Sequence, residues 1–149
     1  MDYFHFQGHR DEPMSIIFDS TKQFEYSIPV IVIGSGGCGL SAALAVKENK
    51  TEVLVIERDP TPLGTTAMST GLIPGANTRF QKEKGIEDDP QIFSEDILNK
   101  TKGLTDPEIS LSLATESAKT IEWLVDNHQV PLSLVDSFLY PGHSVMRMH

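Results

Sequence analysis

The stretch Pro29–Glu57, PVIVIGSGGCGLSAALAVKENKTEVLVIE, decides the fold of this chain. It opens with the apolar, β-branched run Val30–Ile33, which is typical of a strand buried on both faces of a parallel sheet. A glycine turn follows at once, and the alanine-rich segment Leu40–Glu48 then predicts a helix. A second run, Glu52–Ile56, predicts another buried strand. Strand, turn, helix and strand form a βαβ unit, so we expect an α/β fold.

The glycine turn has the spacing of a pyrophosphate-binding loop. Gly34 allows a tight turn out of the strand, Gly36 leaves room for the pyrophosphate, and Gly39 lets the helix pack closely. The start of the helix offers N–H groups and a partial positive charge to the phosphates. Cys38 also lies in the turn. Because the sequence has no second cysteine, we interpret Cys38 as a small residue whose N–H faces the ligand, not as a redox thiol.

An acid stands at the end of the second predicted strand. The carboxylate of Glu57 is placed to accept both ribose hydroxyls of an adenosine, and it disfavours the 2′-phosphate of NADP. The residues after it decide between FAD and NAD. NAD-binding domains of this kind normally continue directly into another helix, whereas residues 58–89 are rich in glycine and hydroxyl residues with little hydrophobic periodicity. We therefore predict an irregular loop here, in place of the helix expected of an NAD-binding domain.

This loop resembles that of the fumarate reductase/succinate dehydrogenase type of FAD-binding flavoproteins. Residues 63–72 read LGTTAMSTGL. In the family, an acid at the strand tip is followed by a Gly-Gly-[Asn/Ser/Thr]-Thr turn and a Ser/Ala-x-Gly-Gly step. Here Leu63 replaces the first glycine of the turn and Leu72 the last glycine of the step. The family includes soluble fumarate and urocanate reductases, 3-ketosteroid dehydrogenases and L-aspartate oxidases.

The resemblance implies roles for residues of the loop. Thr65 and Thr66 contact the phosphates and the flavin side, and Thr70 and Gly71 pass the isoalloxazine ring. Membrane-complex members attach the flavin covalently to a histidine at the position of Thr65, so the implied FAD is non-covalent. The expected cofactor-binding residues are Gly34, Ser35, Gly36, Gly37, Cys38, Gly39, Glu57, Arg58, Gly64, Thr65, Thr66, Ser69, Thr70 and Gly71.

Two helices are predicted after the loop. The first covers Pro90–Lys102, and the second begins at Asp106, a capping carboxylate followed by proline, and ends near Asn127. Trp123 is interpreted as a core or interface residue, and the tail Val130–His149 is predicted to be irregular. We expect residues 1–28 to form a partly disordered N-terminal arm. Residues 29–149 are expected to form the N-terminal part of an incomplete Rossmann-like FAD-binding domain.

One cluster of catalytic residue types lies near the end of the chain. His143, Arg147 and His149 either line an anion site for a carboxylated substrate or are polar residues of a flexible end, and we favour the second interpretation. The acidic run Glu87–Asp89 is interpreted as a solvated turn and helix start, not as an acid/base pair. No catalytic residue is assigned, because the resemblance places the proton donor and substrate ligands beyond His149.

Composition limits the partners. A net charge of −9 argues against nucleic acid and anionic membranes as partners. One cysteine allows neither an intrachain disulfide nor a thiolate zinc cluster, and His5 and His9 are expected to be solvent-exposed, not metal ligands. No apolar run reaches the roughly 18 residues of a membrane span, and the N-terminus does not have the pattern of a secretory signal. We predict a cytoplasmic protein.

The predicted function is that of an FAD-dependent oxidoreductase. The resemblance implies reduction or dehydrogenation of a C–C bond next to a carbonyl or carboxylate, as in a fumarate reductase, with a 3-ketosteroid dehydrogenase as the alternative. The substrate is then a small molecule, a carboxylate or a ketosteroid, and the electron donor is left open. A different alternative is a truncated nucleotide-binding module that lacks the substrate domain and has no turnover, and the length of the chain favours it.

Overall fold

A computed structural model describes residues 20–149, so the predictions for His5, His9 and the start of the arm lie outside the described residues. Internal contacts divide the chain after Gly71 into two compact units. Unit 1 ends at Gly71, and unit 2 is Leu72–His149. Within unit 1, residues 20–28 contain no helix or strand.

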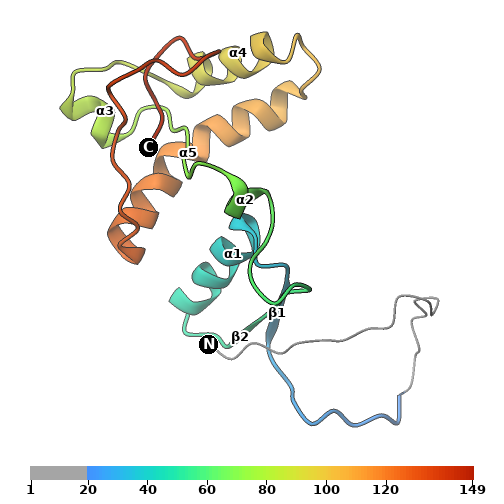
Figure 1. Ribbon diagram of the computed structural model, residues 1–149. Helices are drawn as coiled ribbons and strands as arrows, with labels where there is room; N and C mark the ends of the chain where they lie inside the picture. Colours follow the sequence, from blue (N-terminus) through green and yellow to red (C-terminus); the bar gives the residue numbers. More distant parts are fainter. Residues whose placement is uncertain (1–19) are drawn as a thin grey trace. The chain divides into compact units, whose positions relative to one another are not determined.

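Unit 1 contains the predicted βαβ arrangement. Strands β1 (Val30–Ile33) and β2 (Val53–Ile56) pair in parallel, with Val30 opposite Val53. Helix α1 (Gly37–Glu48) connects them and packs on both strands (Figure 1). This confirms the α/β fold. The helix begins three residues earlier than predicted, because the backbone of Gly36 is extended and acts as the N-cap.

One face of β1 is open, which contradicts the prediction of a strand buried on both faces. Val32 lies against α1, since a Cβ on Gly39 would stand 3.2 Å from its Cγ1. The alternate residues Ile31 and Ile33 point the other way and are 55% and 86% exposed. Only α1 covers the two-stranded sheet of the described residues, so an apolar sequence alone did not ensure burial here.

The segment predicted to be an irregular loop contains two short helices. Helix α2 (Thr65–Met68) follows Gly64 as its N-cap, and helix α3 (Arg79–Glu83) begins in unit 2 after Thr78. Thr78 and Gln81 form a capping box, in which each side chain bonds the backbone N–H of the other. A Thr-x-x-Gln pattern is a recognised helix start, and the sequence interpretation missed it.

Unit 2 is built on the two predicted helices. Helix α4 (Pro90–Lys100) and helix α5 (Pro107–His128) lie side by side (Figure 1). Asp89 and Asp106 cap them as N-cap carboxylates. Helix α4 ends two residues before the predicted Lys102, which has a left-handed φ of 54°. Small residues allow close packing between the helices, and the Ser94 hydroxyl donates to the Ser110 hydroxyl at 3.0 Å.

The tail after α5 is irregular, as predicted, but its end lies in the core of unit 2. Met148 forms an antiparallel bridge with Pro74, and the backbones of Ile73 and His149 exchange two hydrogen bonds of 2.9 Å. Arg147 is fully buried, and His149 is 3% exposed. The interpretation of these residues as part of a flexible end is therefore wrong. No helix in the described range is long and apolar enough to cross a membrane.

Candidate cofactor-binding site

The fold of unit 1 itself requires two of the three motif glycines, Gly34 for its backbone conformation and Gly39 for packing. Gly34 has a φ of +98°, and its N–H donates to the Ile56 carbonyl at 2.7 Å, which ties the turn to the end of β2. A Cβ on Gly39 would stand 2.0 Å from the Gly34 carbonyl oxygen. Any side chain at Gly39 would therefore push α1 away from the turn.

The third motif glycine is not required by the packing of the chain. Gly36 has an extended backbone (φ −72°, ψ 177°) that any residue adopts. Chain neighbours aside, the one described atom within 4 Å of a Cβ built there is Thr66 Oγ1, at 3.9 Å, which is an ordinary contact. The fold therefore leaves open space in front of Gly36, as expected where a ligand comes close to the backbone. Beside it, the Gly37 N–H donates to the same Thr66 oxygen at 3.0 Å.

Glu57 follows β2 and turns its carboxylate toward the glycine turn. Oε2 accepts the N–H and the hydroxyl of Ser35, at 2.8 and 2.5 Å. Oε1 accepts the backbone N–H groups of Arg58 and Asp59, at 2.8 and 3.1 Å. The hydroxyl of Ser35, followed by these backbone donors, lowers the pKa of Glu57 from 4.5 to about 2, against a small effect of burial. The carboxylate is therefore ionised at neutral pH.

A pocket of about 270 Å³ joins these groups. Its lining comes from the glycine turn, the start of α1, the end of β2 and the loop that leads into α2: Ser35, Gly36, Leu40, Glu57, Pro62, Leu63, Gly64, Thr66 and Ala67. Small-molecule pockets usually measure about 300–1,000 Å³, so this pocket holds part of a dinucleotide and not the whole of it. An ionised acceptor and apolar walls suit an adenosine.

Five of the predicted cofactor-binding residues line this pocket: Ser35, Gly36, Glu57, Gly64 and Thr66. The other predicted residues are all described, and all lie outside its lining: Gly34, Gly37, Cys38, Gly39, Arg58, Thr65, Ser69, Thr70 and Gly71. The Arg58 side chain is 90% exposed and pairs with Asp59 at 3.4 Å. Cys38 is exposed, and Gly71 closes unit 1 with a left-handed φ of 79°.

Sequence reasoning missed the apolar lining of the pocket and one side-chain contact. Leu40, Pro62, Leu63 and Ala67 flank predicted contact residues, and that proximity was the available signal. The hydroxyl bond from Ser35 to Glu57 was also predictable in principle. Both residues follow parallel strands that pair with each other, so they meet at the same edge of the sheet.

In unit 2, Arg147 forms a buried ion-pair cluster. Its guanidinium donates two hydrogen bonds of 2.9 Å to Asp88 and one of 2.7 Å to Asp96, and it stacks on the Phe93 ring. The side chains of Arg147 and Asp88 are both fully buried, so the prediction of a solvated Asp88 is wrong. Asp89 does begin α4, as predicted. Because two carboxylates already neutralise Arg147, it is a poor ligand for a free anion.

The two histidines near this cluster are held by aromatic and backbone contacts. The His143 ring lies 5.8 Å from the Phe93 centroid and 5.6 Å from that of Tyr140. His149 contacts the Thr78 hydroxyl through Nε2 and the Arg147 carbonyl through Nδ1, both at 3.0 Å. Burial lowers the pKa of both histidines, which favours neutral rings at pH 7.

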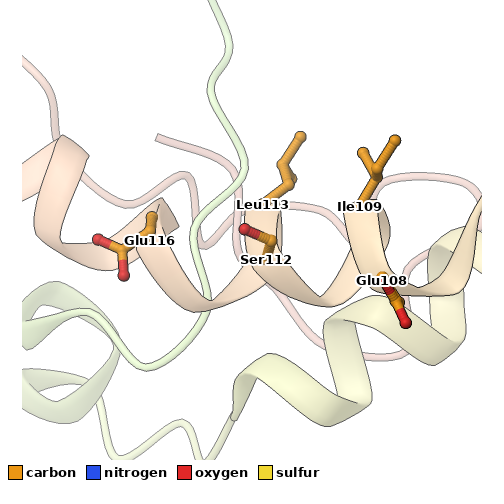
Figure 2. Close-up of a pocket in the computed structure, with 5 residues that line it drawn as sticks. All are labelled: Glu108, Ile109, Ser112, Leu113 and Glu116. Atoms are coloured by element: carbon orange, nitrogen blue, oxygen red, sulfur yellow. The ribbon is translucent and has the colours of Figure 1, made fainter.

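A shallow hollow of about 540 Å³ runs along α5 (Figure 2). The exposed side chains of Ile109 and Leu113 point out from the same stretch of the helix, with Ser112 between them in sequence. Glu108 and Glu116 complete a lining that comes from this single helix. An open hollow on one helix does not enclose a small molecule as a ligand pocket does, so we do not place the cofactor there.

Known proteins were compared with this chain by family, by sequence and by structure. A model of the FAD binding domain family matches residues 29–144. NADH:fumarate oxidoreductase of Klebsiella pneumoniae is 33% identical over 123 residues, which cover 83% of this chain and 13% of that protein. A flavocytochrome c3 fumarate reductase in an open conformation aligns at a TM-score of 0.70 and 29% identity, over 82% of this chain and 21% of that one.

A second solved structure is that of a 3-ketosteroid-delta4-(5alpha)-dehydrogenase from Rhodococcus jostii, in complex with 4-androstene-3,17-dione. It aligns at a TM-score of 0.60 and 29% identity, over 72% of this chain and 22% of that one. The chain therefore spans less than a quarter of the length of each of these three proteins.

Proposed function

This chain belongs to the FAD binding domain family, and from that premise we propose that unit 1 holds the ADP half of an FAD molecule. The observation that carries the proposal is the pocket in which the open glycine turn at Gly36 and the ionised Glu57 lie together. The domain boundary is part of the proposal: residues 29–149 contribute the N-terminal part of the FAD-binding domain. The match of the family model to residues 29–144 supports it.

Each group in the pocket has a distinct task in this proposal. The backbone at Gly36 approaches the diphosphate, and the start of α1 adds N–H donors and a partial positive charge. Glu57 accepts hydrogen bonds from the ribose hydroxyls, and Leu40 and Leu63 provide apolar contact to the adenosine. Thr65, Thr66, Ser69, Thr70 and Gly71 are proposed to continue the site toward the flavin.

We propose that the FAD is bound without a covalent link. Thr65 stands at the position where the covalent members of the resembled family have a histidine, and a threonine hydroxyl does not form that bond. FAD supplies hydride transfer when bound, while the chain supplies binding and orientation. Precipitating the protein with acid should therefore release all of the flavin into the supernatant.

The activity of the whole protein is proposed to be reduction or dehydrogenation of a C–C bond next to a carbonyl or carboxylate. The two similar proteins named for fumarate reduction favour a small carboxylate as substrate. The ketosteroid dehydrogenase supports the alternative of a ketosteroid substrate. Turnover assays with fumarate and with a 3-ketosteroid distinguish the two, and turnover with neither favours a nucleotide-binding module. The cytoplasmic location stays a prediction.

Replacing Glu57 with alanine should weaken FAD binding about tenfold to a hundredfold, because a charge-assisted acceptor for the ribose is lost. Titration of the flavin-free protein with FAD, followed by flavin fluorescence, measures the dissociation constant. Glu52→Ala is the matched control, since Glu52 is exposed at the other end of β2. An unchanged dissociation constant in Glu57→Ala would mean that this acid does not contact the ribose.

A further inference from the structure

We propose that Ser35 is a positioning residue, whose hydroxyl orients the Glu57 carboxylate for the adenosine ribose. This inference rests on the proposed function, because it assigns the way in which Ser35 acts in the FAD site. The sequence analysis placed Ser35 among the cofactor-binding residues but assigned no partner to its hydroxyl. The structure adds a specific contact between its side chain and the acid at the neighbouring strand end.

Ser35 holds one oxygen of the carboxylate with two donors. Its N–H and its hydroxyl both bond Oε2 of Glu57, while the backbone N–H groups of Arg58 and Asp59 bond Oε1. Ser35 is 2% exposed, so water has little access to replace its hydroxyl. The Ser35 hydroxyl is thus the side-chain donor in a set whose other three members are backbone groups, and it is the one that a substitution can remove.

The backbone around Ser35 is itself fixed. The N–H of the preceding Gly34 donates to the carbonyl of Ile56, the residue before Glu57, at 2.7 Å. The turn and the end of β2 are therefore tied together directly before the two residues that form the carboxylate contact. A serine hydroxyl orients an acid well only when both backbones are held in this way, because a free backbone would let the pair separate.

Proton counting separates this role from a contact with the diphosphate. A serine hydroxyl has one proton to donate, and phosphate oxygens of a diphosphate only accept. The proton of Ser35 is already donated to Glu57, over 2.5 Å. Its hydroxyl therefore acts on the ribose through the carboxylate, and the diphosphate is left to the backbone of the turn.

The charged groups around Glu57 are few. Arg58 and Asp59 lie beside it on the same segment and pair with each other at 3.4 Å. Among the described residues that line the pocket, Glu57 is the one charged residue, and those from the turn, α1 and the loop into α2 are uncharged. The low pKa of Glu57 is therefore due to hydrogen bonds, and the two from Ser35 have the largest effects. Removing the hydroxyl should raise that pKa toward its ordinary value of 4.5.

The test compares Ser35→Ala with native protein in its flavin-binding, full-length form. We expect the variant to bind FAD and ADP about threefold to tenfold more weakly at pH 8. The loss should be smaller for 2′-deoxy-ADP, which lacks one of the ribose hydroxyls. Ser41→Ala, the same change on α1 outside the pocket lining, is the matched control and should bind like native protein. Thermal melting verifies that both variants fold.

The pH profile gives a second readout. The ionised carboxylate of Glu57 accepts hydrogen bonds from the ribose hydroxyls. Its contribution to FAD affinity is therefore present above the pKa of Glu57 and is lost as the pH falls through that pKa. In native protein the pKa is about 2, so affinity should show no loss from Glu57 between pH 8 and 4.5. In Ser35→Ala the loss of FAD affinity relative to native protein should grow toward pH 4.5. The further loss should be at most about twofold, because half or less of the Glu57 carboxylate becomes protonated at that pH.

A double-mutant cycle completes the test. In a Glu57→Ala background, where the Ser35 hydroxyl has no side-chain acceptor to orient, Ser35→Ala should cost little further FAD affinity. Equal losses in both backgrounds, or an equal loss for ADP and 2′-deoxy-ADP, would contradict the positioning role. So would tighter FAD binding by Ser35→Ala. Failure of native protein to bind FAD at all would instead overturn the proposed function, so the two failures are distinguishable.

Discussion

Gly36→Val should abolish FAD binding while unit 1 stays folded. The backbone at Gly36 is extended, and among the described residues a Cβ there would meet only Thr66 Oγ1, at 3.9 Å, so the turn has room for a Cβ. The branched side chain would instead occupy the space in which the diphosphate approaches the turn. We expect a loss of more than about a hundredfold in FAD affinity. Flavin fluorescence titration measures it, and circular dichroism reports whether the fold is kept.

Gly39→Ala provides the contrast. Its Cβ would stand 2.0 Å from the Gly34 carbonyl, so this smaller substitution should destabilise unit 1 and lose FAD together with the fold. The two variants separate a glycine needed by the ligand from a glycine needed by the packing. Tight FAD binding by Gly36→Val would show that no diphosphate lies against the turn.

Arg147→Met should destabilise unit 2 by about 3–5 kcal/mol, because it leaves the buried carboxylates of Asp88 and Asp96 without their cation. Trp123, the one tryptophan of the sequence, lies half-buried in α5 and reports the unfolding of unit 2. Denaturant unfolding followed by its fluorescence gives the change in free energy.

Lys119→Met is the control, because Lys119 pairs with Glu116 through a single surface contact on α5 and both side chains are more than half exposed. Exposed pairs of this kind contribute little to stability, so the unfolding midpoint should barely move. If Arg147→Met unfolds at the same denaturant concentration as native protein, then the buried cluster does not hold the tail in the core of unit 2.

Local sequence signals predicted the βαβ unit and the helix starts because each of these features is encoded by neighbouring residues. The glycine turn, the strand runs and the capping residues Asp89 and Asp106 all act within a few positions along the chain. They also placed Glu57 next to the turn, since paired parallel strands bring their ends together. The roles proposed for the individual site residues stay predictions.

What the sequence did not reveal depends on long-range contacts. Arg147 meets Asp88 and Asp96 across more than 50 positions, and no periodicity in the tail indicates such partners. The exposure of Ile33 likewise depends on which element covers that face, and not on the apolar strand itself. The hydroxyl bond from Ser35 to Glu57 joins residues 22 positions apart, and it was overlooked although strand pairing brings both to one edge of the sheet.

The most direct test of the central claim, that this chain binds the ADP half of FAD, is a competition experiment. Flavin-free protein is titrated with FAD in the presence of excess ADP, FMN or NAD. We predict that ADP displaces FAD, because it carries the ribose proposed to bind Glu57 and the diphosphate proposed to lie against Gly36, both of which line the pocket. FMN carries neither group and should compete poorly. Binding of NAD without FAD, or displacement of FAD by FMN but not by ADP, would contradict the claim.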